Sequence, residues 1–174
     1  MKLVNPEGEK TVVVKAGESL LLELEDFDSG SRDFDLTVEL QGENAECQIR
    51  GRASSMGSDK KVWKIKQNFI GSEQVGNIDL RGTAEQESFL QFDAAANLKN
   101  SSVDADASIS ERIILFGDAK GKLLPVLRVE TDKVKSASHG ASIAPVEKEK
   151  ILYLLSRGIG RVEAEKLLKE GFLK

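Results

Sequence analysis

Three side chains of types that bind metals in proteins stand in notable positions: Cys47, Glu111 and His139. His139 is the single histidine and lies between Ser138 and Gly140 in a run of small residues. A neutral imidazole is a competent iron ligand once a hydrogen bond to its other ring nitrogen fixes the tautomer. A lone histidine is more often structural than a ligand, so residue type alone leaves both roles open.

Glu111 interrupts an alternating pattern. Odd positions from 103 to 115 carry apolar side chains and even positions from 104 to 112 carry polar ones, but Glu111 stands at an odd position. A carboxylate there marks either a β-bulge that turns it outward or a buried charge that needs a partner. We expect the bulge. If Glu111 instead faces a subunit interface beside His139, its oxygen and the imidazole nitrogen could bind iron together.

Cys47 also lies in an alternating stretch, between Ala45 and Ile49 on the apolar parity. Its thiol should therefore point into the core, where a cysteine behaves as a small hydrophobe. Because it is the single cysteine, an intrachain disulfide framework and a site with four cysteine ligands within this chain are both excluded.

The elements that position these residues are predicted to be β-strands. From about residue 10 to 134, short apolar runs are separated by Gly, Asn, Asp and Ser roughly every ten residues. Aromatic residues make up 5% of the chain, so aliphatic side chains of even size could stack in coil after coil, which favours a β-helix. No clean repeat is visible, and the pattern alone leaves sandwich, barrel and β-helix open. The clearest strands are 11–14, 19–24, 34–40 and 62–66.

After Pro145 the period changes to that of helices. Residues 146–157 place apolar side chains on one stripe, and Gly158 suits the left-handed residue that ends a helix. A second helix is predicted over 161–169, ended by Gly171. The chain thus divides into a mainly β core, residues 1–144, and a helical hairpin, residues 145–174.

Composition limits the function classes. The chain has 174 residues, 40% of them hydrophobic, and a net charge of −4. An acidic majority argues against a nucleic-acid partner, since phosphate neutralisation carries most nonspecific affinity. No segment is apolar for long enough to cross a bilayer, and no leader pattern is visible. We therefore expect a cytoplasmic protein with no membrane partner.

Several short blocks near the end of the chain occur in one order and spacing. They read SASHGASI at 136–143, YLLSRG at 153–158 and GFL at 171–173. Together they resemble the C-terminal signature of the SufB/SufD family of iron–sulfur cluster assembly scaffold proteins, which work with the ATPase SufC. The resemblance implies a right-handed parallel β-helix followed by C-terminal helices. Since family members are typically longer, this chain looks like a minimal or truncated version, and it is more similar to SufD than to SufB.

The resemblance also assigns roles to the metal-binding types. In SufD-like sequences the histidine of the Ser-His-Gly block is implicated in cluster assembly at the interface with the partner subunit, so the resemblance implies this role for His139. Alignment on residues 115–117 puts Glu111 where SufB proteins carry a functional cysteine. The chain departs from many relatives by one extra residue before His139. Because a cluster usually needs about four protein ligands, a transient cluster would have to bridge two subunits.

The tail carries the positions that engage SufC in the family. These are Tyr153, Leu154, Arg157 and Phe172, although some of them must also pack the hairpin onto the core. The sequence has no G-x-x-x-x-G-K-[ST] loop, so ATP hydrolysis would come from the partner. The resemblance implies a non-enzymatic scaffold that dimerises through its β core, with itself or a larger paralogue, and recruits a SufC-type ATPase through its C-terminal helices.

Two other interpretations stay open. Residues 158–164 resemble the turn of helix-hairpin-helix nucleic-acid-binding modules, which presents backbone amides to a phosphate. Asp104 and Asp106 share a parity, as the acids of a β-helical polysaccharide enzyme would. Salt-dependent binding of DNA would favour the first of these.

Overall fold

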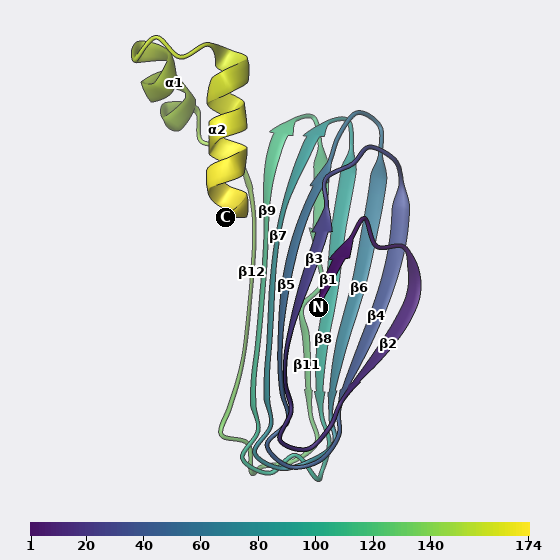
Figure 1. The fold of residues 1–174 in the computed structure, drawn as a ribbon. Helices are drawn as coiled ribbons and strands as arrows, with labels where there is room; N and C mark the ends of the chain where they lie inside the picture. The colour runs from purple at the N-terminus through teal and green to yellow at the C-terminus, as the bar shows by residue number, and fades with distance from the viewer.

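The chain forms a parallel β-helix followed by two short helices in a computed structural model that describes residues 1–174 (Figure 1). The chain alternates between two facing sheets, and every strand pairs in parallel with a strand of the coil before or after it. The predicted β-helix with a C-terminal helical hairpin is therefore confirmed.

The two sheets have six strands each. Sheet A runs in the order β1 (Lys2–Val4), β3 (Ser19–Asp26), β5 (Glu46–Ser55), β7 (Val75–Gln86), β9 (Asp106–Gly117) and β12 (Ser136–Pro145). Sheet B contains β2 (Gly8–Val14), β4 (Arg32–Leu40), β6 (Lys60–Phe69), β8 (Phe89–Leu98), β10 (Lys120–Leu123) and β11 (Val126–Val129), the last two both paired with β8.

Coil length explains why no repeat is visible in the sequence. Leu22, Ile49, Ile78 and Ile109 lie in one row across sheet A, so successive coils are 27, 29 and 31 residues long. The turns absorb these differences while the strands stay in register. A fixed period is thus missing although the coils stack regularly.

The space between the sheets is filled by one apolar cluster with an aromatic row at its centre. Phe34, Trp63 and Phe92 are register partners on β4, β6 and β8, with ring centroids 6.3 and 5.6 Å apart along the row. Gly51 and Gly82 face them from sheet A, and a Cβ at either position would collide with these rings. Side chains of uneven size therefore stack by pairing aromatics with glycines, not by the even aliphatic packing that the composition suggested.

The helical hairpin consists of α1 (Lys148–Ser156) and α2 (Arg161–Leu173). Gly158 has φ +80 and stands just beyond α1, as predicted. Gly171 does not end the second helix, which continues to Leu173, so that boundary prediction was wrong. A glycine inside a helix costs only about 1 kcal/mol, and contacts of the last turn with sheet A, described below, offset that cost. Neither helix has the length and apolarity needed to cross a membrane.

Candidate functional site

Strand β12 is the edge of sheet A and carries His139. It pairs with β9 along its whole length, and no strand of sheet B follows it. His139 is the register partner of Ile109, so it continues the row that is buried in earlier coils. Because partners in a parallel sheet point to the same side, His139 has core parity, yet it is exposed. The last coil therefore leaves an uncovered face containing an imidazole.

Glu111 lies on β9 and is fully buried. The strand keeps continuous register with β7 and β12 through this position, so the predicted bulge was wrong. One carboxyl oxygen, Oε1, accepts a hydrogen bond of 2.9 Å from the backbone N–H of Ala94 across the core. The other oxygen, Oε2, is buried without a hydrogen-bond partner. Glu111 is thus an ionisable group buried in the core, which was the other possibility that the sequence pattern left open.

A break in sheet B lies opposite the carboxyl group of Glu111. β10 and β11 follow β8 with one constant register, but Leu124 and Pro125 separate them. Proline has no N–H and interrupts a ladder of hydrogen bonds. Opposite this break, the Ala94 N–H donates to Glu111. The Glu111 carboxyl group thus supplies an acceptor for the Ala94 N–H at the level of this break.

The surroundings of Glu111 favour its neutral form. Burial raises the pKa of Glu111 to about 8, and the charge of Asp93 adds to the rise. The backbone N–H groups of Ala94 and Leu124 oppose it without cancelling it. A carboxyl group in such a setting keeps its proton near neutral pH.

The fold does not bring Cys47, Glu111 and His139 together within the chain. His139 and Glu111 occupy neighbouring strands, and Ala141, two residues beyond His139, is the register partner of Glu111. The glutamate nevertheless points into the core, while the histidine is exposed. Cys47 is buried on β5, as predicted, and burial raises the pKa of its thiol to about 11. No group of three or more His, Cys, Asp or Glu side chains is arranged to hold a metal ion.

The predicted partner-binding residues of the hairpin fall into two groups. Tyr153 is 57% exposed, and the exposed Arg157 guanidinium lies 5.2 Å from its ring centroid. Leu154 and Phe172 are half-buried. Phe172 lines a crevice of about 360 Å³ between α2 and the ends of β9 and β12. The first pair is thus free to meet a partner, while the second pair belongs mainly to packing.

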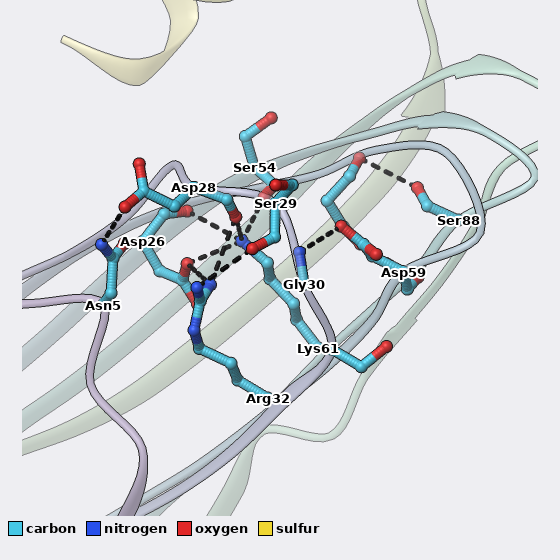
Figure 2. A network of polar contacts seen from close by, with 12 residues as sticks. Asn5, Asp26, Asp28, Ser29, Gly30, Arg32, Ser54, Asp59, Lys61 and Ser88 are labelled. Atoms are coloured by element: carbon cyan, nitrogen blue, oxygen red, sulfur yellow. Dashed lines mark hydrogen bonds and ion pairs between the residues drawn. The ribbon is translucent and has the colours of Figure 1, made fainter.

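A buried polar network at the turn between β3 and β4 did not emerge from the sequence (Figure 2). The ammonium group of Lys61, fully buried, donates to Asp26 Oδ1 at 2.6 Å and to the carbonyls of Asp28 and Ser54 at 2.8 and 2.7 Å. Arg32 also pairs with Asp26, at 2.8 Å. All three donors of Lys61 are used, so the network fastens the turn, and Oδ2 of Asp26 stays buried without a hydrogen-bond partner. Its sequence signal is the same as for Glu111, a charge at a core-facing position of a strand.

Comparison with known proteins adds to this geometry. Residues 12–172 match the family model described as SUF system FeS cluster assembly, SufBD core domain. The chain belongs to the SufB/SufD family. Strand β12 and the hairpin as far as Phe172 lie within the matched range, so the match includes the SufB/SufD signature blocks of the sequence up to that residue.

Relatives within the SufB/SufD family come from distant organisms. The chain is 31% identical over 138 residues to iron-sulfur cluster assembly protein SufD of Bacillus subtilis, covering 79% of this chain and 31% of the relative. It is 26% identical to SufD of Escherichia coli over 141 residues, covering 78% and 32%. A SufBD family protein of Methanocaldococcus jannaschii is 26% identical over 136 residues, covering 78% and 33%. The chain thus spans about a third of the length of these relatives.

Proposed function

We propose that this chain is a non-enzymatic scaffold or adaptor subunit in iron–sulfur cluster assembly by the SUF system. In this proposal, it pairs through β12 with a second copy or a larger paralogue and recruits a SufC-type ATPase through its hairpin. The family match over residues 12–172 carries the proposal, because the relatives it resembles are assembly proteins by name.

The surface of the hairpin supports the recruiting role. Leu152, Tyr153 and Val162 are apolar or aromatic side chains that are 62%, 57% and 84% exposed on two short helices. Tyrosine and arginine dominate the energetics of many protein interfaces, and Arg157 already lies over the ring of Tyr153. A partner would therefore meet an ordered pair and lose little side-chain entropy on binding.

The ATPase contact is tested by mixing the purified chain with the SufC-type ATPase of the same organism and measuring complex mass by size exclusion with light scattering. We expect a complex with the parent chain and at least a tenfold weaker one with Tyr153→Ala/Arg157→Ala. Lys64→Ala, on the outer face of sheet B, is the control and should bind like the parent. If the ATPase binds another SufB/SufD protein but not this chain, the recruiting role is wrong. Salt-dependent binding of duplex DNA in the same assay would favour the nucleic-acid alternative.

The edge of β12 supports pairing. An unpaired strand edge is a template for another strand, and the core-parity face of β12 presents Ala141 and the 41% exposed Ile143 without a covering strand. We expect Ile143→Asp to convert a dimer to a monomer in light scattering, because a charge would be buried at the contact. Ser142→Asp, which points to the other side of the strand, is the matched control. A parent chain that stays monomeric alone and with a larger paralogue contradicts pairing.

His139 is the residue best placed to hold iron or a nascent cluster as cargo at such a contact. Its exposed imidazole can be reached by a metal, whereas the carboxyl group of Glu111 is enclosed and would need β12 to shift first. We expect His139→Ala to lower the iron retained by the paired assembly after anaerobic reconstitution. If Glu111 also ligates iron, Glu111→Ala lowers it as well, while Glu111→Gln separates lost ligation from lost packing. Unchanged iron in His139→Ala rules out the histidine.

A further inference from the structure

The outer face of sheet A carries a row of arginines that the function above does not use. Arg52, Arg81 and Arg112 are register partners on β5, β7 and β9. Asp79 sits among them, with its carboxylate oxygens 2.7 Å from Arg52, 3.4 Å from Arg81 and 3.2 Å from Arg112. Three stacked guanidinium groups would repel one another, and one carboxylate holds them together.

The ionisation of Asp79 agrees with this arrangement. Burial by itself would raise the pKa of Asp79, but the hydrogen bond and charge of Arg52, the charge of Arg81 and the hydrogen bond from Arg112 outweigh burial and leave the pKa below its ordinary value. Asp79 is therefore ionised at neutral pH, and the row is fixed in place as a cationic surface.

The last turn of α2 docks on this row. The Nε of Arg52 donates to the carbonyl of Leu173 at 2.8 Å, and Arg81 donates to the carbonyl of Phe172 at 3.3 Å. The final carbonyls of a helix lack partners within the helix and form the negative end of its dipole. The two arginines supply both the missing donors and the opposite charge, so they hold α2 by its C-terminal end.

The remaining attachments of the hairpin are few. Lys169 of α2 pairs with Glu85 of β7 at 2.6 Å and lies 5.5 Å from the ring centroid of Phe116. The crevice beside Phe172 leaves part of the boundary between α2 and the core unfilled. α1 packs chiefly against α2 and stands beyond the end of the solenoid (Figure 1). Polar contacts, more than apolar packing, therefore set the direction in which the hairpin projects.

We propose that Arg52 and Arg81, held by Asp79, are positioning residues that fix the orientation of the hairpin on the solenoid. They couple the hairpin to strands two and three places from the β12 edge. If the chain has the proposed function, this coupling gives the arginine row a role in transmitting movement of a hairpin-bound ATPase to the β12 edge. The row touches neither the exposed Tyr153 and Arg157 nor His139.

The proposal is tested on the isolated chain by electron paramagnetic resonance distances. In a Cys47→Ala background, spin labels go on Val162→Cys at the start of α2 and on Lys64→Cys on the outer face of β6. We expect a narrow distance distribution in this parent and at least a twofold broader one in Arg52→Ala/Arg81→Ala. Lys99→Ala, which removes an exposed ion pair with Glu130 at the end of sheet B, is the control and should leave the width unchanged.

A second variant tests the same proposal if Arg52→Ala/Arg81→Ala folds poorly. Asp79→Asn does not touch α2 but removes the negative charge that pairs with both arginines, so it should broaden the distribution while circular dichroism still reports an intact solenoid. Arg52→Lys keeps the charge but not the forked geometry and should give an intermediate width. A width equal to that of the parent in both Arg52→Ala/Arg81→Ala and Asp79→Asn overturns the proposal.

The distance measurement needs no ATPase, so its failure is distinct from a failure of the proposed function. Where the ATPase does bind, Arg52→Ala/Arg81→Ala should bind it within about twofold of the parent, because the exposed hairpin surface is intact. Nucleotide-dependent changes in hydrogen exchange over 136–145 should then be lost. If those changes persist in the variant, movement reaches β12 by another route and the assigned role is wrong.

Discussion

The solenoid and the hairpin are held together by different kinds of force. The solenoid encloses a continuous apolar cluster that runs through all its coils, with an aromatic row at the centre. The hairpin has two fully or nearly fully buried side chains, Ile151 and Ala164, and reaches the solenoid through hydrogen bonds and one ion pair. Burial of apolar area gives large, non-directional stabilisation, whereas a few polar contacts give direction at little net free energy.

This difference separates two tasks within one chain. A rigid stack can keep an edge strand and its side chains in place, while a weakly packed appendage can be moved by a partner without unfolding the stack. Regions that move in function are drawn from the least stable parts of a structure. The comparison predicts that changes in the solenoid have large effects on global stability and that changes in the hairpin have small ones.

The largest effect is expected for Trp63→Ala in the middle of the solenoid. Removing the ring leaves a cavity between Phe34 and Phe92, and such truncations cost about 3–5 kcal/mol. Urea unfolding followed by circular dichroism measures this loss, with the outward-facing Lys64→Ala on the same strand as the control. A loss below about 1 kcal/mol would show that the coils do not depend on the aromatic row.

The next effect concerns Glu111 and pH. Because its pKa is raised from an ordinary 4.5 to about 8, the unfolded chain releases this proton at a lower pH than the folded chain. Its contribution to the free energy of unfolding is thus fully present below about pH 4.5 and is lost as pH rises through about 8. The loss is on the order of a few kcal/mol.

Glu111→Gln tests this directly, because an amide imitates the neutral acid and does not titrate. Denaturant unfolding at several pH values between 5 and 9 should show a decline for the parent chain and a flatter curve for the variant. The variant should exceed the parent above pH 8. Parallel curves would show that Glu111 is ionised in the folded protein across this range.

Much of the solenoid could be predicted from the sequence because alternation reports which side chains face the core. It placed Cys47 inside and singled out Glu111 as an exception on the core side. Coil length varied too much for the register to be read, so the row linking Ile109 to His139 became visible only in three dimensions. The bulge expected at Glu111 was wrong because the carboxyl group meets a donor that the local sequence does not reveal, the Ala94 N–H on the opposite sheet.

The arginine row could not be predicted from the sequence either. Arg52, Arg81 and Arg112 are about 30 residues apart, and nothing local in the sequence relates them to each other or to the last turn of α2. Outward-facing charges on alternating strands are usually solvated. Only the register of the sheet and the docking of a distant helix make these arginines a unit. The family resemblance assigned roles to the hairpin residues but did not reveal which side chains hold the hairpin on the solenoid.

A smaller effect is expected where the hairpin meets the solenoid. Lys169→Gln removes the ion pair with Glu85, whose side chains are about one fifth exposed, and should lower the global free energy of unfolding by no more than about 1 kcal/mol. Hydrogen exchange over 161–173 should nevertheless accelerate severalfold, since local opening needs less free energy than global unfolding. Lys166→Gln, on the same helix with a looser partner, is the control. Equal acceleration across the solenoid strands would show that hairpin and solenoid open together.

The smallest effect on folding is expected for Leu152→Ser on α1. The side chain is 62% exposed and packs little, so the free energy of unfolding should change by less than about 0.5 kcal/mol. If the exposed hairpin face is a docking surface, the same change should weaken binding of the ATPase by about 1 kcal/mol or more, a fivefold effect, because a buried leucine contributes apolar area to an interface. Unfolding and binding measured on one preparation separate the two quantities. A leucine that matters for folding but not for binding would place this face of α1 against the chain itself, and the hairpin would then be a closing element of the solenoid, not an independent arm.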